Sequence, residues 1–444
     1  MTTLNEDVNY NRVARHNTPT ILTEEDIRIV VSRKLGNQRF RLLSWNVSSF
    51  NKGYGFLGAY FNVTAMVSVE DNANVEELRF FAKTPPPPES TLGTFLERCD
   101  GFNKEINVYD ELIPHMGVGS GGKWYVDCYF CKKDRIIVME DITVLGYVMP
   151  DKYKPLDFQH TALMLKAIAR LHSRSLILDE RLHLNGQSIW NLYGEKLGEV
   201  IFRKDNSALR MLDATLMGIN RIIEEVGRIK EFNSHEVDVL KKRVKTWSYK
   251  MSHLLSPSAK YRNVICHRDI WANNLMFKYG ADGNPQGCCL IDFQLFRYSP
   301  PAIDVELSLH VNTDRRTRDE YYDNFIRIYY TELTEALAEE GLDEKHCLPW
   351  EIFKETRQFA KNVALVFTLL CLPIMLIGSG ELKSCFDGPP EVLEDFIYRS
   401  GKANLMSYQF ATIKPYQERM IECVLEVWQR LPDEPFLLPN LHQQ

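Results

Sequence analysis

The 444-residue sequence lacks a surplus of either charge. Lys and Arg together number 53 and Asp and Glu 59, which gives a formal net charge of -6. Proteins that bind nucleic acid or an anionic membrane surface usually carry a basic excess. The composition therefore predicts neither partner, and a site for an anionic ligand would have to be locally basic.

Paired cysteine spacing and an apolar N-terminal segment are lacking as well. The 10 cysteines are scattered, and residues 1–20 contain no apolar stretch of the kind that secretory signals carry. This pattern fits a reducing compartment, so we expect a cytoplasmic protein without disulfides. Cys128 and Cys131 are closely spaced, but strand side chains alternate between faces, so we expect their sulfurs to point apart to opposite faces or to sit askew, and no second pair is present to complete a zinc site.

No apolar run has the length that a membrane span needs. The most apolar stretch, residues 363–377, holds about 15 residues and includes Thr368 and Pro373, whereas a spanning helix needs about 20. We expect a buried helix here and no membrane span.

Two short segments carry side chains suited to phosphate chemistry. A strand-like run leads into His267 and Asp269, Asn274 follows five positions after that Asp, and a second apolar run ends in Asp292. Phosphoryl transfer needs a carboxylate that orients the acceptor hydroxyl, and it needs oxygen ligands for Mg²⁺. Asp269 suits the first role, and Asn274 and Asp292 suit the second. Taken singly, either acid could instead cap a turn or end a strand.

The first third of the chain alternates between apolar and polar residues as an antiparallel sheet does. The predicted strands are 40–45, 57–69, 78–83, 124–130 and 135–139, which together make a five-stranded sheet. A helical stretch, 92–115, interrupts them, and helical periodicity dominates after Asp157.

Gly53, Gly55 and Gly58 form a G-x-G-x-x-G pattern between the first two predicted strands. A dinucleotide-binding fingerprint would be followed by a helix, whereas a strand follows here. Glycines let a backbone approach phosphates closely, so the hairpin could cover a nucleotide. A glycine-rich hairpin of purely structural use is the open alternative.

Together these segments resemble a known group of kinases. The His-x-Asp with its Asn, followed by a strand and Asp-Phe, resembles the catalytic and metal segments of protein kinases and of aminoglycoside and choline kinases. Trp271, the Asn273-Asn274 pair and Ile-Asp-Phe-Gln at 291–294 are most similar to the ecdysteroid kinase-like group, also called CHK kinase-like.

The resemblance implies an α+β, protein-kinase-like two-lobe fold with a small antiparallel β-sheet lobe and a larger α-rich lobe. The division expected from it is an N-terminal segment (1–26), an N-lobe with the glycine-rich hairpin and hinge (27–142), and an α-rich C-lobe with the catalytic and metal-binding loops (143–444).

The resemblance also implies residue roles. Lys83 would bind the nucleotide's phosphates and pair with Glu105, while the backbone of the hinge at Glu140 and Ile142 would meet the adenine. The implied cofactors are ATP and Mg²⁺. The implied substrate is a small hydrophobic molecule, such as an ecdysteroid or a toxin, that is phosphorylated on a hydroxyl group.

Two residues near the catalytic segment carry further expectations. Asp304 either caps the helix that it begins or, as in related kinases, braces the catalytic loop. Arg268 stands where the superfamily usually has Gly, and a bulky cation beside Asp269 is expected to reshape the acceptor pocket.

Three other functions compete with this hypothesis. A catalytically silent kinase-fold protein could hold a nucleotide or a lipophile without turnover, and a choline-type kinase or a protein kinase would use the same motifs. The filled chemical positions argue against the silent protein. The lack of an Ala-Pro-Glu element after Asp292 argues against a protein kinase. Nothing in the sequence indicates an oligomeric state.

Overall fold

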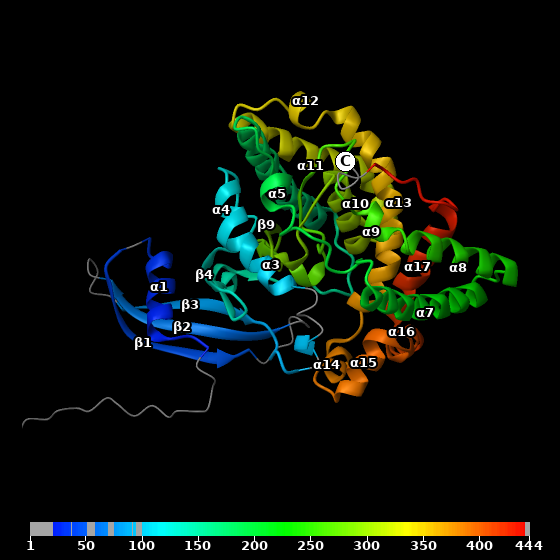
Figure 1. Ribbon diagram of the computed structural model, residues 1–444, viewed down its shortest axis with the longest axis horizontal. Coiled ribbons are helices and arrows are strands. Elements are labelled where there is room, and N and C mark those ends of the chain that lie inside the picture. The colour runs from blue at the N-terminus through cyan, green and yellow to red at the C-terminus, as the bar shows by residue number, and fades with distance from the viewer. Residues whose placement is uncertain are drawn as a thin grey trace, which may run out of the picture.

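The computed structural model describes residues 21–36, 38–50, 58–69, 75–90, 92–94 and 100–439. They form a small lobe built on one sheet and a larger helical lobe beside it (Figure 1). This is the α+β, protein-kinase-like two-lobe architecture that the motifs predicted.

The small lobe is an antiparallel sheet of five strands in the order β1-β2-β3-β5-β4. Its strands are β1 (Phe40–Ser49), β2 (Ala59–Val69), β3 (Val75–Thr84), β4 (Cys128–Lys132) and β5 (Ile136–Glu140). The odd positions of β2 from Phe61 onward are buried, as the alternation predicted. They form a core with the buried face of α1 (Glu24–Lys34), which begins with a capping box made by Thr23 and Asp26.

The expectation that the sulfurs of Cys128 and Cys131 point apart is wrong. Their Sγ atoms lie 3.3 Å apart. The pairing of β4 with β5 shifts register between Cys128 and Phe130. A bulge of this kind breaks the strict alternation of faces on which the prediction depended.

The helical stretch predicted over 92–115 is more irregular than expected. The structure has α3 (Gly101–Asn107), a π-helical turn, η1 (Val108–Leu112), and then α4 (Ile113–Met116). The segment lies between the sheet and the large lobe in Figure 1. It places Glu105, which is fully buried, at the junction of the lobes.

The large lobe is built from helices with a few short strands. Its helices are α5 (Phe158–His183), α6 (Ile189–Tyr193), α7 (Asn206–Ile229), α8 (Ser234–Ser248), α9 (Met251–Leu254), α10 (Pro301–Asn312), α11 (Arg315–Glu339), α12 (Glu344–Cys347), α13 (Trp350–Met375), α14 (Ser379–Phe386), α15 (Pro390–Tyr398), α16 (Gly401–Thr412) and α17 (Lys414–Arg430). Its strands are β6 (Tyr147–Val148), β7 (Val264–Cys266), β8 (Leu275–Tyr279), β9 (Pro285–Leu290) and β10 (Arg297–Ser299).

Helix α13 contains the apolar run noted in the sequence. By length and composition alone it could cross a membrane. In the structure it packs against α10 and α17, and its residues from Val363 to Leu370 are buried in the core of the large lobe. It is therefore the buried helix that the sequence predicted.

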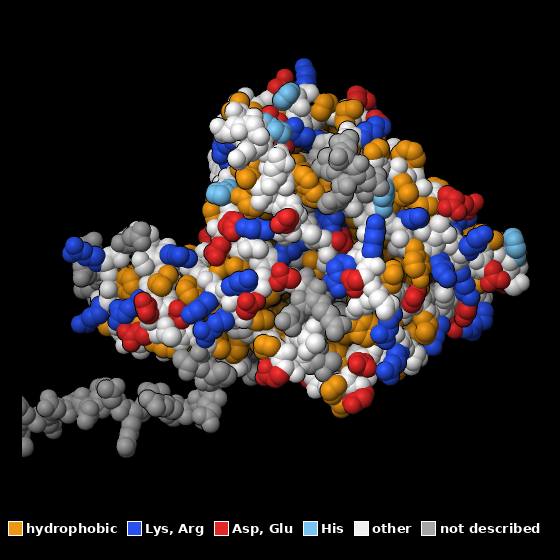
Figure 2. All heavy atoms as spheres, viewed as in Figure 1, with side chains coloured by type: hydrophobic (Ala, Val, Ile, Leu, Met, Phe, Trp, Pro, Cys, Tyr) orange, Lys and Arg blue, Asp and Glu red, His pale blue; other side chains and the backbone are white. Residues whose placement is uncertain are grey.

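Charge is distributed evenly over the part of the surface that can be inspected. Among the described residues on the face in Figure 2, basic and acidic side chains are interspersed. This distribution agrees with the balanced charge of the sequence.

Candidate active site

Two strand pairs of the large lobe bring the chemical side chains together. Strand β7 is wholly buried, pairs with β10, and delivers His267 and Asp269 into the following loop. Strands β8 and β9 form an antiparallel hairpin, so Asn274 before β8 and Asp292 after β9 lie at the same end of that hairpin. A hydrogen bond from the Ile291 amide to the Asn274 carbonyl oxygen (3.1 Å) fixes this neighbourhood.

Asn274 is held against Asp269 by both hydrogens of its amide group. Its Nδ2 donates to Asp269 Oδ2 at 2.8 Å and to the Asp269 carbonyl oxygen at 2.9 Å. With both hydrogens engaged, Asn274 Oδ1 is left to meet another group. An amide oxygen is a ligand that Mg²⁺ accepts, so this orientation fits a metal-binding role.

Lys83 joins the small lobe to this site. Its Nζ lies 2.7 Å from Glu105 Oε2 of α3 and 2.9 Å from Asp292 Oδ1. Glu105 also accepts a hydrogen bond from the Phe293 amide (3.3 Å). One buried cation thus links a strand, a helix and the loop after β9, an arrangement suited to holding a phosphate-binding lysine in place.

The charges at the site act strongly on one another. Burial would lower the pKa of Lys83, but Asp292 and Glu105 outweigh it and hold that pKa well above its usual value. Burial, reinforced by the charge of Asp292, raises the pKa of Asp269 to about 7. A carboxyl group with a pKa near neutrality is suited to accept a proton during a reaction.

Asp304 braces the loop that carries His267, Arg268 and Asp269. Its Oδ2 accepts from the His267 amide at 2.7 Å, and its Oδ1 accepts from the Arg268 amide at 2.8 Å. Helix α10 begins at Pro301, so Asp304 lies inside its first turn and does not cap it. Of the two roles expected for Asp304, the structure contains the brace.

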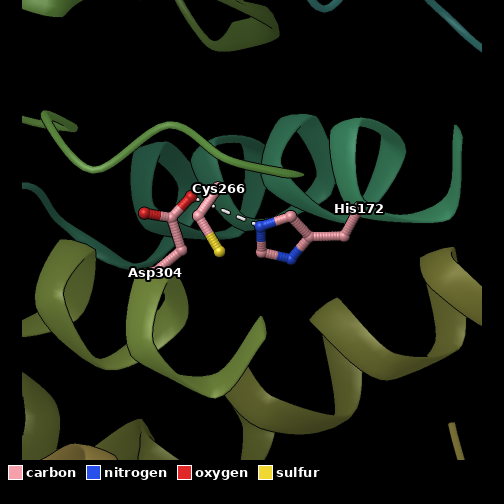
Figure 3. Close-up of side chains that lie close together, drawn as sticks. All are labelled: His172, Cys266 and Asp304. Carbon is pink, nitrogen blue, oxygen red and sulfur yellow. Dashed lines mark hydrogen bonds and ion pairs between the residues drawn. The ribbon is translucent and has the colours of Figure 1, made fainter. Parts of the chain in front are cut away.

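Figure 3 shows Asp304 beside His172 and Cys266, all three buried. Their ligand atoms lie within 4.8 Å of one another, which resembles a metal site. Each side chain has another use, however. His172 Nδ1 forms a hydrogen bond with the Tyr329 hydroxyl group at 2.8 Å. Burial raises the pKa of the Cys266 thiol, so this thiol stays neutral. With the oxygens of Asp304 taken by two amides, the cluster is a support for the loop.

Arg268 adopts a backbone conformation that glycine favours. Its φ is 70°, in the left-handed region, which accounts for the Gly usual in the superfamily at this place. Its guanidinium is buried and lies over the ring of Phe367 at 5.9 Å, with Nε and Nη1 unbonded among the described residues. Arg268 is also not among the described residues that line the cavity below, so the expected reshaping of the acceptor pocket is not seen.

The structure describes only some of the residues that we expect to contact the nucleotide. Gly53 and Gly55 lie outside the described residues, whereas Gly58 stands directly before β2. The Glu140 carboxylate forms ion pairs with Lys34 (2.9 Å) and Lys123 (2.8 Å). Its side chain is thus engaged, and only the backbone of the hinge could meet a base.

Ile142 is the last residue of the expected hinge. It begins the short 3-10 turn η2 (Ile142–Leu145), which Asp141 caps by accepting a hydrogen bond from the Thr143 amide. The hinge thus turns sharply into the large lobe, with the Ile142 side chain buried in the core.

Gly58 lies where a side chain would collide with the neighbouring strand. A Cβ atom added there would lie 2.7 Å from the Thr84 carbonyl oxygen, next to Lys83. We expect Gly58→Ala to destabilise the protein by about 1–3 kcal/mol, the usual cost of overpacking, and to weaken nucleotide binding. Urea unfolding and nucleotide titration measure both effects.

Gly380→Ala is the matched control, because nothing lies within 4 Å of a Cβ at that position. If both variants unfold at the same urea concentration, the tight contact between Gly58 and β3 is unimportant.

A cavity of about 530 Å³ contains this chemistry at one end. The chemical side chains that line it are Lys83, Asp269, Asn274 and Asp292. Its other walls include described residues of 85–103, 200–204 and 248–252, and also α7 and the segment α13 to α16, whose lining side chains are mostly apolar. Sequence periodicity gave these segments as helices but did not show that they face Asp269. Tyr60 of β2 also lines the cavity, and the sequence analysis did not identify it. Its position opposite Lys83 in the pairing of β2 with β3 could have indicated this place.

Comparison with known proteins identifies one family. Residues 52–341 match the model of the ecdysteroid kinase-like family. A search of curated protein sequences finds no match.

Several solved structures are similar at low identity. APH(2")-IIia in its GDP and kanamycin complex is 13% identical, covers 76% of this chain and 97% of its own, and has a TM-score of 0.32. A choline/ethanolamine kinase family protein from Mesorhizobium loti is 11% identical, with coverage of 85% and 92% and a TM-score of 0.31. The microcompartment-associated aminopropanol kinase is 10% identical, with coverage of 86% and 97% and a TM-score of 0.30. Scores this low carry no argument about the site, which depends on its own geometry.

Proposed function

Because this chain belongs to the ecdysteroid kinase-like family, we propose that it transfers the γ-phosphate of ATP to a hydroxyl group of a small hydrophobic acceptor, such as an ecdysteroid or a toxin. The observation that carries the proposal is the convergence of Lys83, Asp269, Asn274 and Asp292 on one cavity whose remaining walls are mostly apolar.

Each side chain has a role in this proposal. Asp269 orients the acceptor hydroxyl and takes its proton. Lys83, held by Glu105, binds the phosphates of the nucleotide, and the hairpin with Gly53, Gly55 and Gly58 covers them. The backbone at Glu140 and Ile142 meets the adenine.

Asn274 and Asp292 would hold Mg²⁺. Their free oxygens fit a hard cation, since Asn274 uses only its nitrogen toward Asp269 and Asp292 uses Oδ1 toward Lys83. When bound, the cation neutralises the charge of the phosphates and orients them for transfer.

The apolar end of the cavity supports a hydrophobic acceptor. The apolar side chains in its walls include Leu209, Leu212, Leu370, Ile374, Phe386, Phe396 and Ile397. The described acids that line the cavity are Asp100, Asp134, Asp269 and Asp292, and none comes from α7 or from α13 to α16. A choline-type acceptor carries a positive charge and would need an acid or an aromatic cage there. Phe386 and Phe396 are aromatic, but the buried ammonium group of Lys402 lies 5.6 Å from the centre of the Phe396 ring and would repel a second cation. This lining therefore favours a hydrophobic acceptor without a positive charge over choline.

The test is a transfer assay on the full chain. Purified protein is incubated with ATP labelled on the γ-phosphate, Mg²⁺, and a panel of hydroxylated steroids, hydroxylated alkaloids, choline and peptides, and products are identified by mass spectrometry. We expect phosphate on a hydroxyl of a hydrophobic compound, and only when Mg²⁺ is present. Nucleotide binding without any product would instead indicate a silent binding protein, and phosphopeptides would indicate a protein kinase.

A further inference from the structure

The cavity contains one buried cation that the proposed chemistry does not use. Lys402 lies in the first turn of α16, lines the cavity and is 4% exposed. Its Nζ donates to Thr215 Oγ1 at 3.0 Å and lies 5.6 Å from the centre of the Phe396 ring. No carboxylate of the described residues forms an ion pair with it.

A charge in this position opposes folding. Burial lowers the pKa of Lys402 to about 8, because few groups around it compensate the ammonium. The first turn of a helix also disfavours a cation, since the positive end of the helix dipole lies there. An apolar side chain would fill the same space without these costs. The best explanation for a lysine at this position is therefore a ligand that enters the cavity and meets the ammonium group.

The hydrogen bonds around Lys402 leave capacity for a ligand. Thr215 Oγ1 donates its own hydrogen to the Met211 carbonyl oxygen (2.9 Å) and accepts from Lys402. The hydroxyl is therefore satisfied and holds the ammonium group in position. An ammonium group has three hydrogens, of which this contact uses one.

Lys402 and Asp269 face the same space from different elements. Cys371 of α13 lines this cavity together with Leu370 and Ile374 of the same helix. Burial is the main cause that raises the pKa of the Cys371 thiol, so Cys371 is neutral and contributes no charge of its own. A molecule that places a hydroxyl at Asp269 can therefore reach Lys402 along the apolar wall.

Building on the proposed function, we propose that Lys402 is a specificity-determining residue that binds an anionic oxygen group of the acceptor. The acceptor is then a hydrophobic molecule with a hydroxyl group at one end and a carboxylate or sulfate at the other. The buried ammonium favours such a molecule and opposes a cationic one, so the site selects by attraction and by repulsion together.

The test compares a hydroxylated hydrophobic carboxylic acid with its methyl ester. Binding of each to the full chain is measured by calorimetry without ATP, and phosphorylation of each is measured with ATP and Mg²⁺. We expect the acid to bind more tightly. Lys402→Met should weaken binding of the acid, and lower its kcat/KM, by about 10- to 100-fold, the value of a hydrogen bond to a charged group. Binding of the ester should stay the same.

Two further variants separate recognition from folding. Lys402→Arg keeps the charge and should retain part of the preference for the acid. Lys383→Met, at an exposed lysine of α14, should change nothing. Lys402→Met should melt at or above the temperature of the parent, because it removes a buried charge that opposes folding.

The outcomes separate this inference from the proposed function. Acid binding that depends on Lys402, without phosphate transfer to any compound, supports the inference and overturns the proposed function. Equal binding of acid and ester by the parent, or by parent and Lys402→Met alike, overturns the inference even if the ester is phosphorylated.

Discussion

Asp269→Asn is expected to lower kcat by about 10²- to 10⁴-fold, the usual contribution of a general base. The amide keeps the shape of the carboxyl group and can still accept from Asn274, but it cannot take a proton from the acceptor hydroxyl. Nucleotide affinity should stay within about threefold of the parent, because Lys83 and Asp292 are unchanged. Steady-state kinetics and nucleotide titration measure the two effects separately.

Stability is the control for this variant. Burial and Asp292 raise the pKa of Asp269 to about 7, above the 3.8 of an unperturbed carboxyl group. Its ionised form therefore opposes folding at neutral pH, and Asp269→Asn should unfold no more easily than the parent. Turnover within tenfold of the parent would show that another group accepts the proton.

Asp304→Ala is expected to lower the free energy of unfolding by roughly 3–5 kcal/mol, the cost of removing one member of a buried charged network. The change leaves the amides of His267 and Arg268 without their acceptor, at a site that is 1% exposed. Without Asp304, the backbone of Arg268 is no longer held in its left-handed conformation, which is less favourable than a right-handed one by about 1–2 kcal/mol. Urea unfolding measures the loss, and activity should fall with it because Asp269 follows directly in the loop.

Asp314→Ala is the matched control, because Asp314 caps α11 by accepting one amide at its end. That change should cost about 1 kcal/mol. Burial would raise the pKa of Asp304, but His172 and the neighbouring amides hold it below 3.8. The stability that Asp304 provides is therefore present above pH 3.8 and lost as the pH falls below it. If the two variants lose the same stability at neutral pH, the loop is held by other contacts.

Much of the fold and of the arrangement of the candidate site could be predicted, because both depend on short segments of sequence. Alternation along β2 follows directly from strand geometry, and it gave the buried face correctly. Asp269, Asn274 and Asp292 could be linked because short spacing and one hairpin bring them together. The residue types indicated which chemistry to propose, and the local structure determined how these side chains are arranged.

The rest depends on contacts between distant segments. Lys402 lies at the start of α16, and the sequence of that segment does not show which residues it meets in the fold. The sequence allowed Asp304 to be interpreted as a helix cap, because its contact with the amide of Arg268 forms only in the folded chain. The approach of Cys128 to Cys131 arises from a bulge, which the pattern of residues does not encode.

Helix α13 contributes both to the wall of the cavity and to the support of the loop that carries Asp269. Leu370 and Ile374 form part of the cavity wall, while Phe367, less than one turn before Leu370, supports the guanidinium of Arg268 beside Asp269. A substitution that shifts this helix to admit a larger acceptor would also move the support of the catalytic loop. Helices α15 and α16 line the same cavity, and their main contacts are with α7 and with each other, together with α14 for α15 and α17 for α16. Diversification of substrates among related chains is therefore expected to be concentrated in α15 and α16, with α13 held nearly constant.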